Sequence, residues 1–312
     1  MTIDSAFSKP QKLPVTQIQL PELTEKGIKL WLLRLDQTHP YISGNKWYKL
    51  KYNLEFAVDN GYRTVLSFGG AYSNHIHALA WAAKEVGLNS IGVIRGEPEY
   101  AANPTLSDAQ EWAMQLKFVN RQDYRLRQDP DYIQQLCNSL PESLQPVLVI
   151  PEGGSNKLAV KGCREILSEQ VLQHVKPDRV ILACGTGGTL SGVAVSQPTQ
   201  DILGIPVLKN AAFLYDDIRN LIQSSGEVDP QNWTLDLDGH FGGYAKCPPD
   251  LTDFIQRIES ECGVPLDQVY TAKMLLRTLQ MIKQDLIKPG STLLALHTGG
   301  LQGKRSVYGS KN

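Results

Sequence analysis

The feature that most constrains the fold is the alternation of short apolar runs with amphipathic stretches along the chain. Runs of strand length followed by stretches with helical periodicity are typical of repeated β–α units and of a mostly parallel sheet. Strands are expected at residues 64–68, 90–95, 147–150, 180–184, 202–207 and 292–296. Helices are expected at residues 73–86, 157–170, 214–224, 249–262 and 272–285. The pattern therefore predicts an α/β protein.

The chain length limits the number of domains. A chain of 312 residues with 42% hydrophobic residues can bury a large core, as two domains or as one large α/β unit. The segment 151–155 (Pro-Glu-Gly-Gly-Ser) breaks the pattern, which favours a crossing between two sheet domains there. We expect two domains, each a mostly parallel twisted sheet flanked by helices. Residues 1–48 with 150–312 form the larger one, and residues 49–149 form a smaller domain inserted into it.

Composition and charge exclude several classes of function. The formal net charge of −1 provides no long-range field for nucleic acid. No run approaches the ~20 apolar residues that span a bilayer, and residues 1–15 lack the apolar run of a signal peptide. The five cysteines have no paired spacing, which favours reduced thiols over disulfides or a zinc site. We expect a cytoplasmic protein with no nucleic-acid partner, no membrane partner and no metal.

A glycine-rich loop is the clearest sign of a ligand. It consists of Gly185, Thr186, Gly187, Gly188 and Thr189. Because the loop joins an apolar run to a helix, its amides and the helix dipole favour a phosphate, although a tight turn explains the same glycines. Leu190 stands where a dinucleotide fingerprint needs glycine, and Gly192-Val193 stands where a P-loop needs Gly-Lys-Ser/Thr. A monophosphate cofactor is therefore favoured over NAD or ATP.

Two further segments carry polar groups suited to a site. Lys46 and Lys49 have the spacing that places both on one face of a helix, if a helix begins there. A lysine that forms a Schiff base must lose its proton, which burial and a neighbouring cation assist, whereas most lysines are simply solvated. Ser73 and Asn74 follow the apolar run 64–68. They either cap the next helix or face a ligand at the carboxyl end of a parallel strand.

Taken in order, these segments resemble the 1-aminocyclopropane-1-carboxylate (ACC) deaminase and D-cysteine desulfhydrase family, which has the tryptophan-synthase-β-like fold (fold type II). The motifs that carry the resemblance are Gly44-Asn45-Lys46 with Lys49, Gly69-Gly70 with Ser73-Asn74, Gly153-Gly154-Ser155, the glycine-rich loop, Val269-Tyr270-Thr271 and His297-Thr298-Gly299-Gly300. The likeness runs from about residue 18 to about residue 300, which is nearly the whole chain. The resemblance implies that the cofactor is pyridoxal 5′-phosphate (PLP), bound in the cleft between the two domains.

The resemblance also implies roles for individual residues. Lys46 would form the Schiff base with PLP, Lys49 would contact the phosphate, and Asn74 would hydrogen-bond the 3′-hydroxyl. The loop from Gly185 to Thr189 would cradle the phosphate. The family's catalytic serine and its two active-site tyrosines are matched by Ser73, Tyr270 and Tyr244, although either tyrosine would also serve as packing.

The residues expected near the substrate are Tyr72, Ser73, His75 and Thr298. ACC deaminases are recognised by a glutamate near the pyridine nitrogen and a leucine at a second position, and this chain has Thr271 and Thr298 there, as the desulfhydrase type has hydroxyl residues. A hydroxyl keeps the ring nitrogen protonated far less than a carboxylate does, which suits β-elimination better than cyclopropane opening. Trp47-Tyr48 and Tyr72 depart from the family pattern and are expected to reshape the substrate side.

The resemblance thus implies a PLP-dependent lyase or deaminase that acts on a small amino acid. D-cysteine desulfhydrase-like β-elimination, which gives a 2-oxo acid, ammonia and sulfide, is the first interpretation, and ACC deamination is the second. A β-replacement synthase and a PLP-binding protein without turnover stay open as further alternatives. A homodimer is expected, because dimers are usual in this family.

Overall fold

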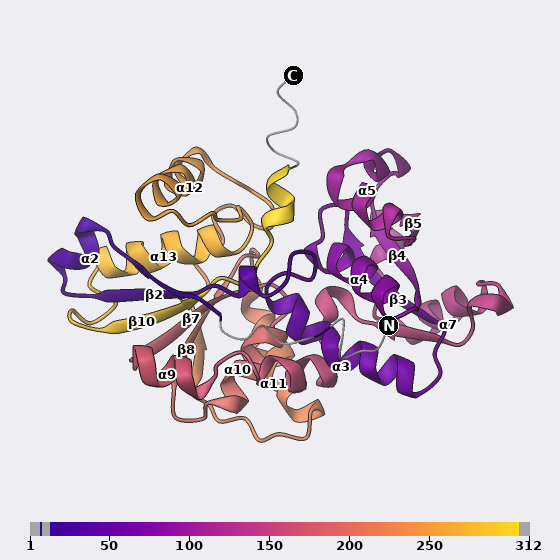
Figure 1. The fold of residues 1–312 in the computed structure, drawn as a ribbon, viewed down its shortest axis with the longest axis horizontal. Helices are drawn as coiled ribbons and strands as arrows, with labels where there is room; N and C mark the ends of the chain where they lie inside the picture. The colour runs from indigo at the N-terminus through magenta and orange to yellow at the C-terminus, as the bar shows by residue number, and fades with distance from the viewer. Residues whose placement is uncertain (1–6, 8–12, 306–312) are drawn as a thin grey trace.

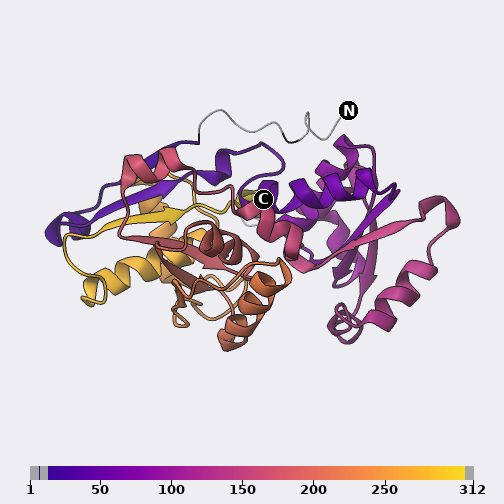
Figure 2. The ribbon, with the colours of Figure 1, turned by 90° about the horizontal axis from the view of Figure 1, so that it is seen from below.

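The computed structural model describes residue 7 and residues 13–305, and it contains two sheets with helices on their faces (Figure 1). All six strands expected from the sequence are present, and the chain is an α/β protein as predicted. The two sheets form two lobes, with helix α3 (Asn45–Asp59) between them, and both views show the same separation (Figures 1 and 2).

The larger sheet has six strands in the order β1-β2-β10-β7-β8-β9. Their bounds are β1 (Val15–Ile18), β2 (Lys29–Leu33), β10 (Thr292–Leu296), β7 (Arg179–Cys184), β8 (Asp201–Pro206) and β9 (Trp233–Leu235). Only the pairing of β1 with β2 is antiparallel among these strands. Strand β7 is apolar at successive positions because both faces of the sheet are covered: Val180 and Ile181 belong to different core clusters.

Helices cover both faces of the larger sheet. The first core cluster contains residues of α8 (Lys157–Cys163), α9 (Glu169–Val175), α10 (Gly188–Ser196) and α11 (Leu214–Ser224). The second contains residues of α2 (Pro21–Glu25), α12 (Pro249–Cys262) and α13 (Thr271–Lys283). A single helix was expected at residues 157–170, but the structure has two, because the Ser168 side chain accepts a hydrogen bond from Val171 N and caps a new helix.

The smaller sheet has four parallel strands in the order β5-β4-β3-β6. Their bounds are β5 (Gln115–Val119), β4 (Asn89–Arg95), β3 (Thr64–Gly70) and β6 (Val147–Ile150). Helices α4 (Asn74–Glu85) and α5 (Pro104–Glu111) pack on one face, together with α3, and α6 (Arg121–Arg125) and α7 (Pro130–Asn138) pack on the other. Short 3-10 turns are η1 (Leu35–Gln37), η2 (Pro98–Ala102), η3 (Glu142–Leu144), η4 (Glu152–Gly154), η5 (Ala211–Phe213) and η6 (Leu301–Lys304).

The two sheets share one hydrophobic core. Leu182 of β7, Leu50 of α3 and Leu79 of α4 are all fully buried in the same cluster. The domain boundary expected after residue 48 falls inside α3, and the domain limits stay a prediction. Within the described residues, no helix has the length and apolar character needed to cross a membrane.

Candidate functional site

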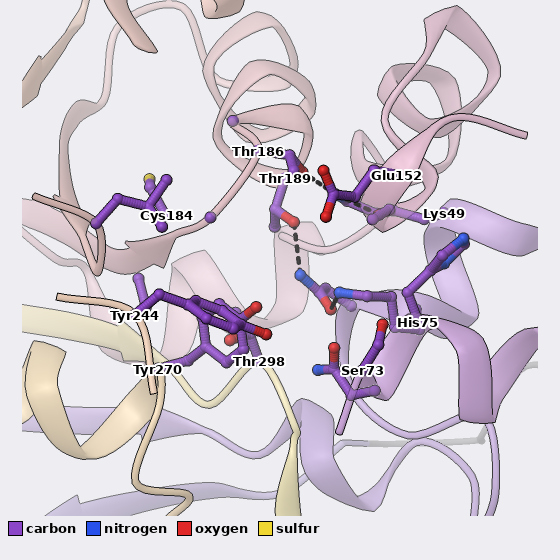
Figure 3. A pocket seen from close by; sticks show the side chains of 18 of the residues that line it. Lys49, Ser73, His75, Glu152, Cys184, Thr186, Thr189, Tyr244, Tyr270 and Thr298 are labelled. Carbon is purple, nitrogen blue, oxygen red and sulfur yellow. Dashed lines mark hydrogen bonds between the residues drawn. The ribbon is translucent and has the colours of Figure 1, made fainter. Parts of the chain in front are cut away.

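The carboxyl ends of β3, β7 and β10 and the turn after β6 border one cavity of about 250 Å³ (Figure 3). Ligands commonly bind at this edge of parallel sheets. The residues predicted for the site that line this cavity are Lys46, Lys49, Ser73, Asn74, His75, Gly185, Thr186, Gly187, Thr189, Tyr244, Tyr270 and Thr298. The structure therefore brings an amine from the first third of the chain next to the glycine-rich loop from the second half.

The start of α3 places the Lys46 amine in the cavity. Gly44 has φ +70°, and a Cβ there would overlap the carbonyl of Thr298, so only glycine allows this approach. Asn45 N donates to the same carbonyl at 3.2 Å, which fixes the first turn of α3 against the loop after β10. The helix then directs the side chains of both Lys46 and Lys49 toward the cavity.

The Lys46 amine is buried and held by an amide. Its Nζ donates to Asn45 Oδ1 at 2.9 Å, and Asn45 Nδ2 donates to Thr189 Oγ1 at 2.7 Å. Burial, and then the charge of Lys49, lower the pKa of Lys46 well below its usual range. A neutral amine is the form that attacks a carbonyl or accepts a proton, so the environment suits the predicted role.

The Lys49 amine lies at the glycine-rich loop and has no carboxylate partner within residues 13–305. It donates to Ser155 Oγ at 2.8 Å, to Gly153 O at 3.1 Å and to Thr186 Oγ1 at 3.4 Å. Its side chain is only 2% exposed, and burial lowers its pKa. A buried amine surrounded by hydroxyl and carbonyl groups is stabilised by a bound anion.

The glycine-rich loop provides the matching donors. Helix α10 begins at Gly188 with no side-chain cap, so the N–H groups of its first turn are available to a ligand. A Cβ at Gly187 would approach Ile218 Cγ1 to 2.6 Å, and one at Gly188 would lie 3.2 Å from Lys49 Nζ. The loop is therefore packed closely around the Lys49 amine, as a phosphate cradle requires.

The N-terminus of α4 forms the opposite wall. Ser73 is the N-cap, as predicted, and its Oγ accepts from Ile76 N at 3.3 Å. His75 is buried, with Nε2 2.8 Å from Ser67 Oγ and Nδ1 without a partner among the described residues. Burial, followed by the charges of Lys46 and Lys49, lowers the pKa of His75 well below its usual range, so the ring is neutral.

Two tyrosines face this wall across the cavity (Figure 3). Tyr270 precedes α13, and its ring lies edge-on to that of Tyr244, with 6.2 Å between the centroids. Burial, and then Tyr244, raise the pKa of Tyr270 well above its usual range, so its phenol stays protonated. Asp267, which sequence reasoning missed, accepts from Tyr270 N at 2.7 Å and from Thr271 N at 2.8 Å, and so fixes this turn.

The hydroxyls predicted to distinguish the substrate occupy different positions. Thr298 lines the cavity, whereas Thr271 is fully buried and does not line it. Thr271 Oγ1 lies 3.4 Å from Nδ1 of His297, which also accepts from Gly299 N, while Nε2 lies 2.8 Å from the Pro265 carbonyl. These contacts assign the proton to Nε2. The proposed contact of Thr271 with a pyridine nitrogen stays a prediction.

Several aromatic residues and one glycine of the predicted site lie outside the cavity lining. Tyr72 is 50% exposed, whereas Trp47 and Tyr48 are buried in the core cluster. Gly188 of the glycine-rich loop does not line the cavity, and a Cβ on it would contact Ser155 Oγ and Lys49 Nζ. Lining residues that the sequence reasoning did not assign are Asn45, Gly70, Arg95, Arg127, Glu152, Gly153, Ala183, Cys184, Leu190 and Leu208. Of these, only Asn45, Gly70 and Gly153 belong to motifs that sequence inspection could have used.

The donors present fit a cofactor that has a phosphate at one end and a carbonyl at the other. Lys49, Ser155 and the first turn of α10 suit the phosphate, and Lys46 suits the carbonyl. The two lysine side chains lie one helical turn apart on α3, so a single small molecule can reach both.

Comparison with known proteins supports this interpretation. The family described as "Pyridoxal-phosphate dependent enzyme" matches residues 11–299. A Pyrococcus horikoshii protein provisionally named 1-aminocyclopropane-1-carboxylate deaminase is 30% identical over 98% of this chain and 95% of its own length. The mitochondrial bifunctional D-cysteine desulfhydrase/1-aminocyclopropane-1-carboxylate deaminase of Arabidopsis thaliana is 30% identical over 93% of this chain and 76% of its own.

A solved structure agrees with the sequence matches. The crystal structure of an ACC deaminase homologue is 27% identical, with a TM-score of 0.85 over 99% of this chain and 98% of that chain. The family resemblance, the fold and the cofactor predicted from the sequence are thereby confirmed. The chain belongs to the pyridoxal-phosphate dependent enzyme family.

Proposed function

We propose that this enzyme is a lyase that eliminates the β-substituent of a small amino acid, in the manner of a D-cysteine desulfhydrase. The products would be a 2-oxo acid and ammonia, with sulfide as the third product from D-cysteine. The proposal rests on the observation that one cavity is lined by a proton acceptor and a proton donor. The acceptor is the Lys46 amine, whose pKa is lowered, and the donor is the Tyr270 phenol, whose pKa is raised. β-Elimination needs both.

When bound, PLP supplies the electron sink that makes the substrate Cα proton acidic. Lys49, Ser155 and the amides of the α10 N-terminus would hold its phosphate, and Lys46 would hold its carbonyl end. The neutral Nζ of Lys46, when it is free of the cofactor, would accept the Cα proton of the bound substrate. The Tyr270 hydroxyl then donates a proton to the departing β-substituent, while the Ser73 turn binds the substrate carboxylate.

The proposal predicts the pH dependence of turnover. The Lys46 amine is released only after the substrate has bound, so kcat, which reports the enzyme–substrate complex, should rise with pH through a pKa below the usual lysine range. The raised pKa of Tyr270 keeps its phenol protonated across the neutral range, so no fall from tyrosine ionisation is expected there.

The second candidate is ACC deamination, which the name of the Arabidopsis relative favours. Thr271 and Thr298 favour elimination instead, since neither supplies a carboxylate to the pyridine ring. Purified enzyme should be given D-cysteine, L-cysteine and ACC, with pyruvate, 2-oxobutyrate and sulfide measured. Pyruvate with sulfide supports the proposal, and 2-oxobutyrate from ACC alone overturns it. Sulfide-dependent consumption of O-acetylserine would indicate a β-replacement synthase. Bound PLP without any product would indicate a PLP-binding protein without turnover.

Two variants test the residue roles. Tyr270→Phe should keep the absorbance of bound PLP but lose most of the elimination rate, about 100-fold or more for a general acid. Lys46→Ala should form no adduct that borohydride reduces. An adduct at Lys49 in that variant would place the cofactor linkage elsewhere. We also propose a homodimer, on the family resemblance, and a cytoplasmic location, on the unpaired spacing of the cysteines. Light scattering of the purified enzyme would test the first, and cell fractionation would test the second.

A further inference from the structure

A second hollow, of about 350 Å³, lies beside the catalytic cavity. We call it the arginine hollow, and it is lined by Arg95, Arg121, Tyr124, Arg125, Arg127 and Glu152. Arg95, Arg127 and Glu152 also line the catalytic cavity. The two spaces therefore share a wall, and a ligand that fills one touches side chains of the other.

The arginine hollow has an excess of positive charge. Its one carboxylate, Glu152, is already engaged, since it accepts from Arg127 Nε and from the Tyr124 hydroxyl, both at 2.6 Å. Arg95, Arg121 and Arg125 form no ion pair with any carboxylate of residues 13–305. Three guanidinium groups are thus left for a ligand, and guanidinium binds oxyanions with two parallel hydrogen bonds.

Packing against Tyr124 holds one unpaired guanidinium group, that of Arg95, and the paired group of Arg127 in place. The Cζ atoms of Arg95 and Arg127 lie 5.4 and 5.1 Å from the ring centroid of Tyr124, which is itself only 3% exposed. Arg95 ends β4, and its Nη2 lies 3.7 Å from the position that a Cβ on Gly70 would take. Gly70 lines the catalytic cavity, so the Arg95 guanidinium lies where the two spaces join.

We propose that the arginine hollow binds an oxyanion at the far end of the substrate side chain. The preferred substrates would then be amino acids whose β-substituent ends in a phosphate or carboxylate group. This inference rests on the proposed β-elimination. For a serine phosphate, the Cα proton passes to Lys46 Nζ, and the Cβ–O bond breaks with its electron pair leaving on phosphate. The arginines neutralise that phosphate, so a leaving group of this kind needs less help from Tyr270.

The test compares O-phosphoserine with serine, using both enantiomers and the PLP-loaded enzyme. Binding is measured by calorimetry and by the change in cofactor absorbance, so that turnover is not required. The wild type should bind O-phosphoserine at least about tenfold more tightly than serine, and added NaCl should reduce this preference. Inorganic phosphate should compete with O-phosphoserine and not with serine.

Single variants assign the effect to the hollow. Arg95→Gln and Arg125→Gln should each remove about tenfold of the preference for O-phosphoserine over serine, and Arg125→Gln, whose side chain lines the hollow and not the catalytic cavity, should leave serine binding unchanged. Both side chains are exposed, so neither change threatens folding. Arg63→Gln is the matched control, because exposed Arg63 lies just before β3, at the amino ends of the strands of the same sheet and away from the hollow. It should leave the binding of both ligands unchanged.

Three results would overturn the inference. One is equal binding of O-phosphoserine and serine by the wild type. Another is an equal loss for both ligands in Arg95→Gln, which would assign this guanidinium to the α-carboxylate. The third is phosphate binding at the arginines without competition with O-phosphoserine, which would assign the hollow to a free anion.

The same experiment separates this inference from the proposed function. Tight, arginine-dependent binding of O-phosphoserine without formation of a 2-oxo acid from any amino acid supports the hollow and refutes the lyase. Turnover of D-cysteine without any preference for O-phosphoserine supports the lyase and refutes the hollow.

Discussion

Lys273 offers a quantitative test, because it is a fully buried lysine whose partners among the described residues are two backbone carbonyls. Its Nζ donates to His240 O at 3.0 Å and to Gly243 O at 2.7 Å, in the loop that carries Tyr244. Burial lowers its pKa from 10.5 to about 8. Replacing Lys273 with methionine keeps most of the side-chain volume and removes both the charge and the two hydrogen bonds.

The two losses act in opposite directions and depend differently on pH. Leaving the two carbonyls unpaired costs about 1–3 kcal/mol each at any pH. The folded-state pKa of Lys273 lies below its unfolded-state pKa, so its charge lowers the stability of the wild type below pH 8. That cost disappears as pH rises from about 8 toward 10.5. It is about 3 kcal/mol at pH 7 and about 2 kcal/mol at pH 9, since one pKa unit corresponds to about 1.4 kcal/mol.

Stability of the wild type relative to Lys273→Met should therefore increase by about 1 kcal/mol between pH 7 and pH 9. Urea unfolding of the PLP-loaded proteins, followed by tryptophan fluorescence at several pH values, measures this difference. Other titrating groups are the same in both proteins and cancel. A difference that stays constant, or that moves in favour of the variant as pH rises, would refute the assigned pKa.

Three further changes test the site and the packing beneath it. Gly44→Ala should cost most of the bound PLP, measured by absorbance, because its Cβ overlaps a backbone carbonyl; Gly61→Ala is the matched control, with the same φ of +70° and no atom within 4 Å of the added Cβ. Lys49→Gln should weaken PLP binding about tenfold or more in an absorbance titration, and an unchanged affinity would exclude Lys49 from the phosphate site. Gly162→Ala should lower the free energy of unfolding by about 3 kcal/mol, because its Cβ meets a backbone carbonyl of α3, whereas Gly303→Ala should lie within about 0.5 kcal/mol of the wild type.

Five of the six strands predicted from the sequence are inner strands; the sixth, β6, lies at a sheet edge. The inner strands β3, β4, β7, β8 and β10 are continuous apolar runs, because helices cover both sides of each sheet. Strand β5 lies at a sheet edge, and only one of its five residues is fully buried, so its pattern is weak. The strands β1, β2 and β9 were also missed, and two of these are edge strands as well.

Helix α3 was difficult to predict for a different reason. It buries Lys46, Lys49 and Asn53, residue types that usually mark an exposed face, so its hydrophobic pattern is interrupted. These polar residues are buried because α3 lies between the two sheets and carries part of the site. The buried polar residues of the site interrupt the hydrophobic pattern of α3, but the Gly44-Asn45-Lys46 motif still marks the start of the helix.

Ser73, the glycine-rich loop and Thr298 could be found from the sequence because they follow the predicted strands β3, β7 and β10, whereas Lys46 and Tyr270 were found only through the family motifs. Arg95 and Glu152 also follow predicted strands, but no local pattern marks them as neighbours. Their proximity depends on how the turn after β6 packs against the end of β4. Long-range placement of this kind requires the structure, so the arginine hollow could not be inferred from the sequence.

The buried charges connect the stability of this protein to its chemistry. Lys46 and Lys49 are both buried, and neither forms an ion pair with a carboxylate of residues 13–305, so the protonated form of either amine is disfavoured when no anion is present. A carboxylate beside the two amines would remove this cost, but it would also hold Lys46 protonated and would occupy the proposed phosphate cradle. The absence of a fixed anion from the cradle therefore serves two purposes at once. It favours the neutral form of the Lys46 amine, and with the proposed phosphate contact it would make the stability of the folded state depend on the bound cofactor.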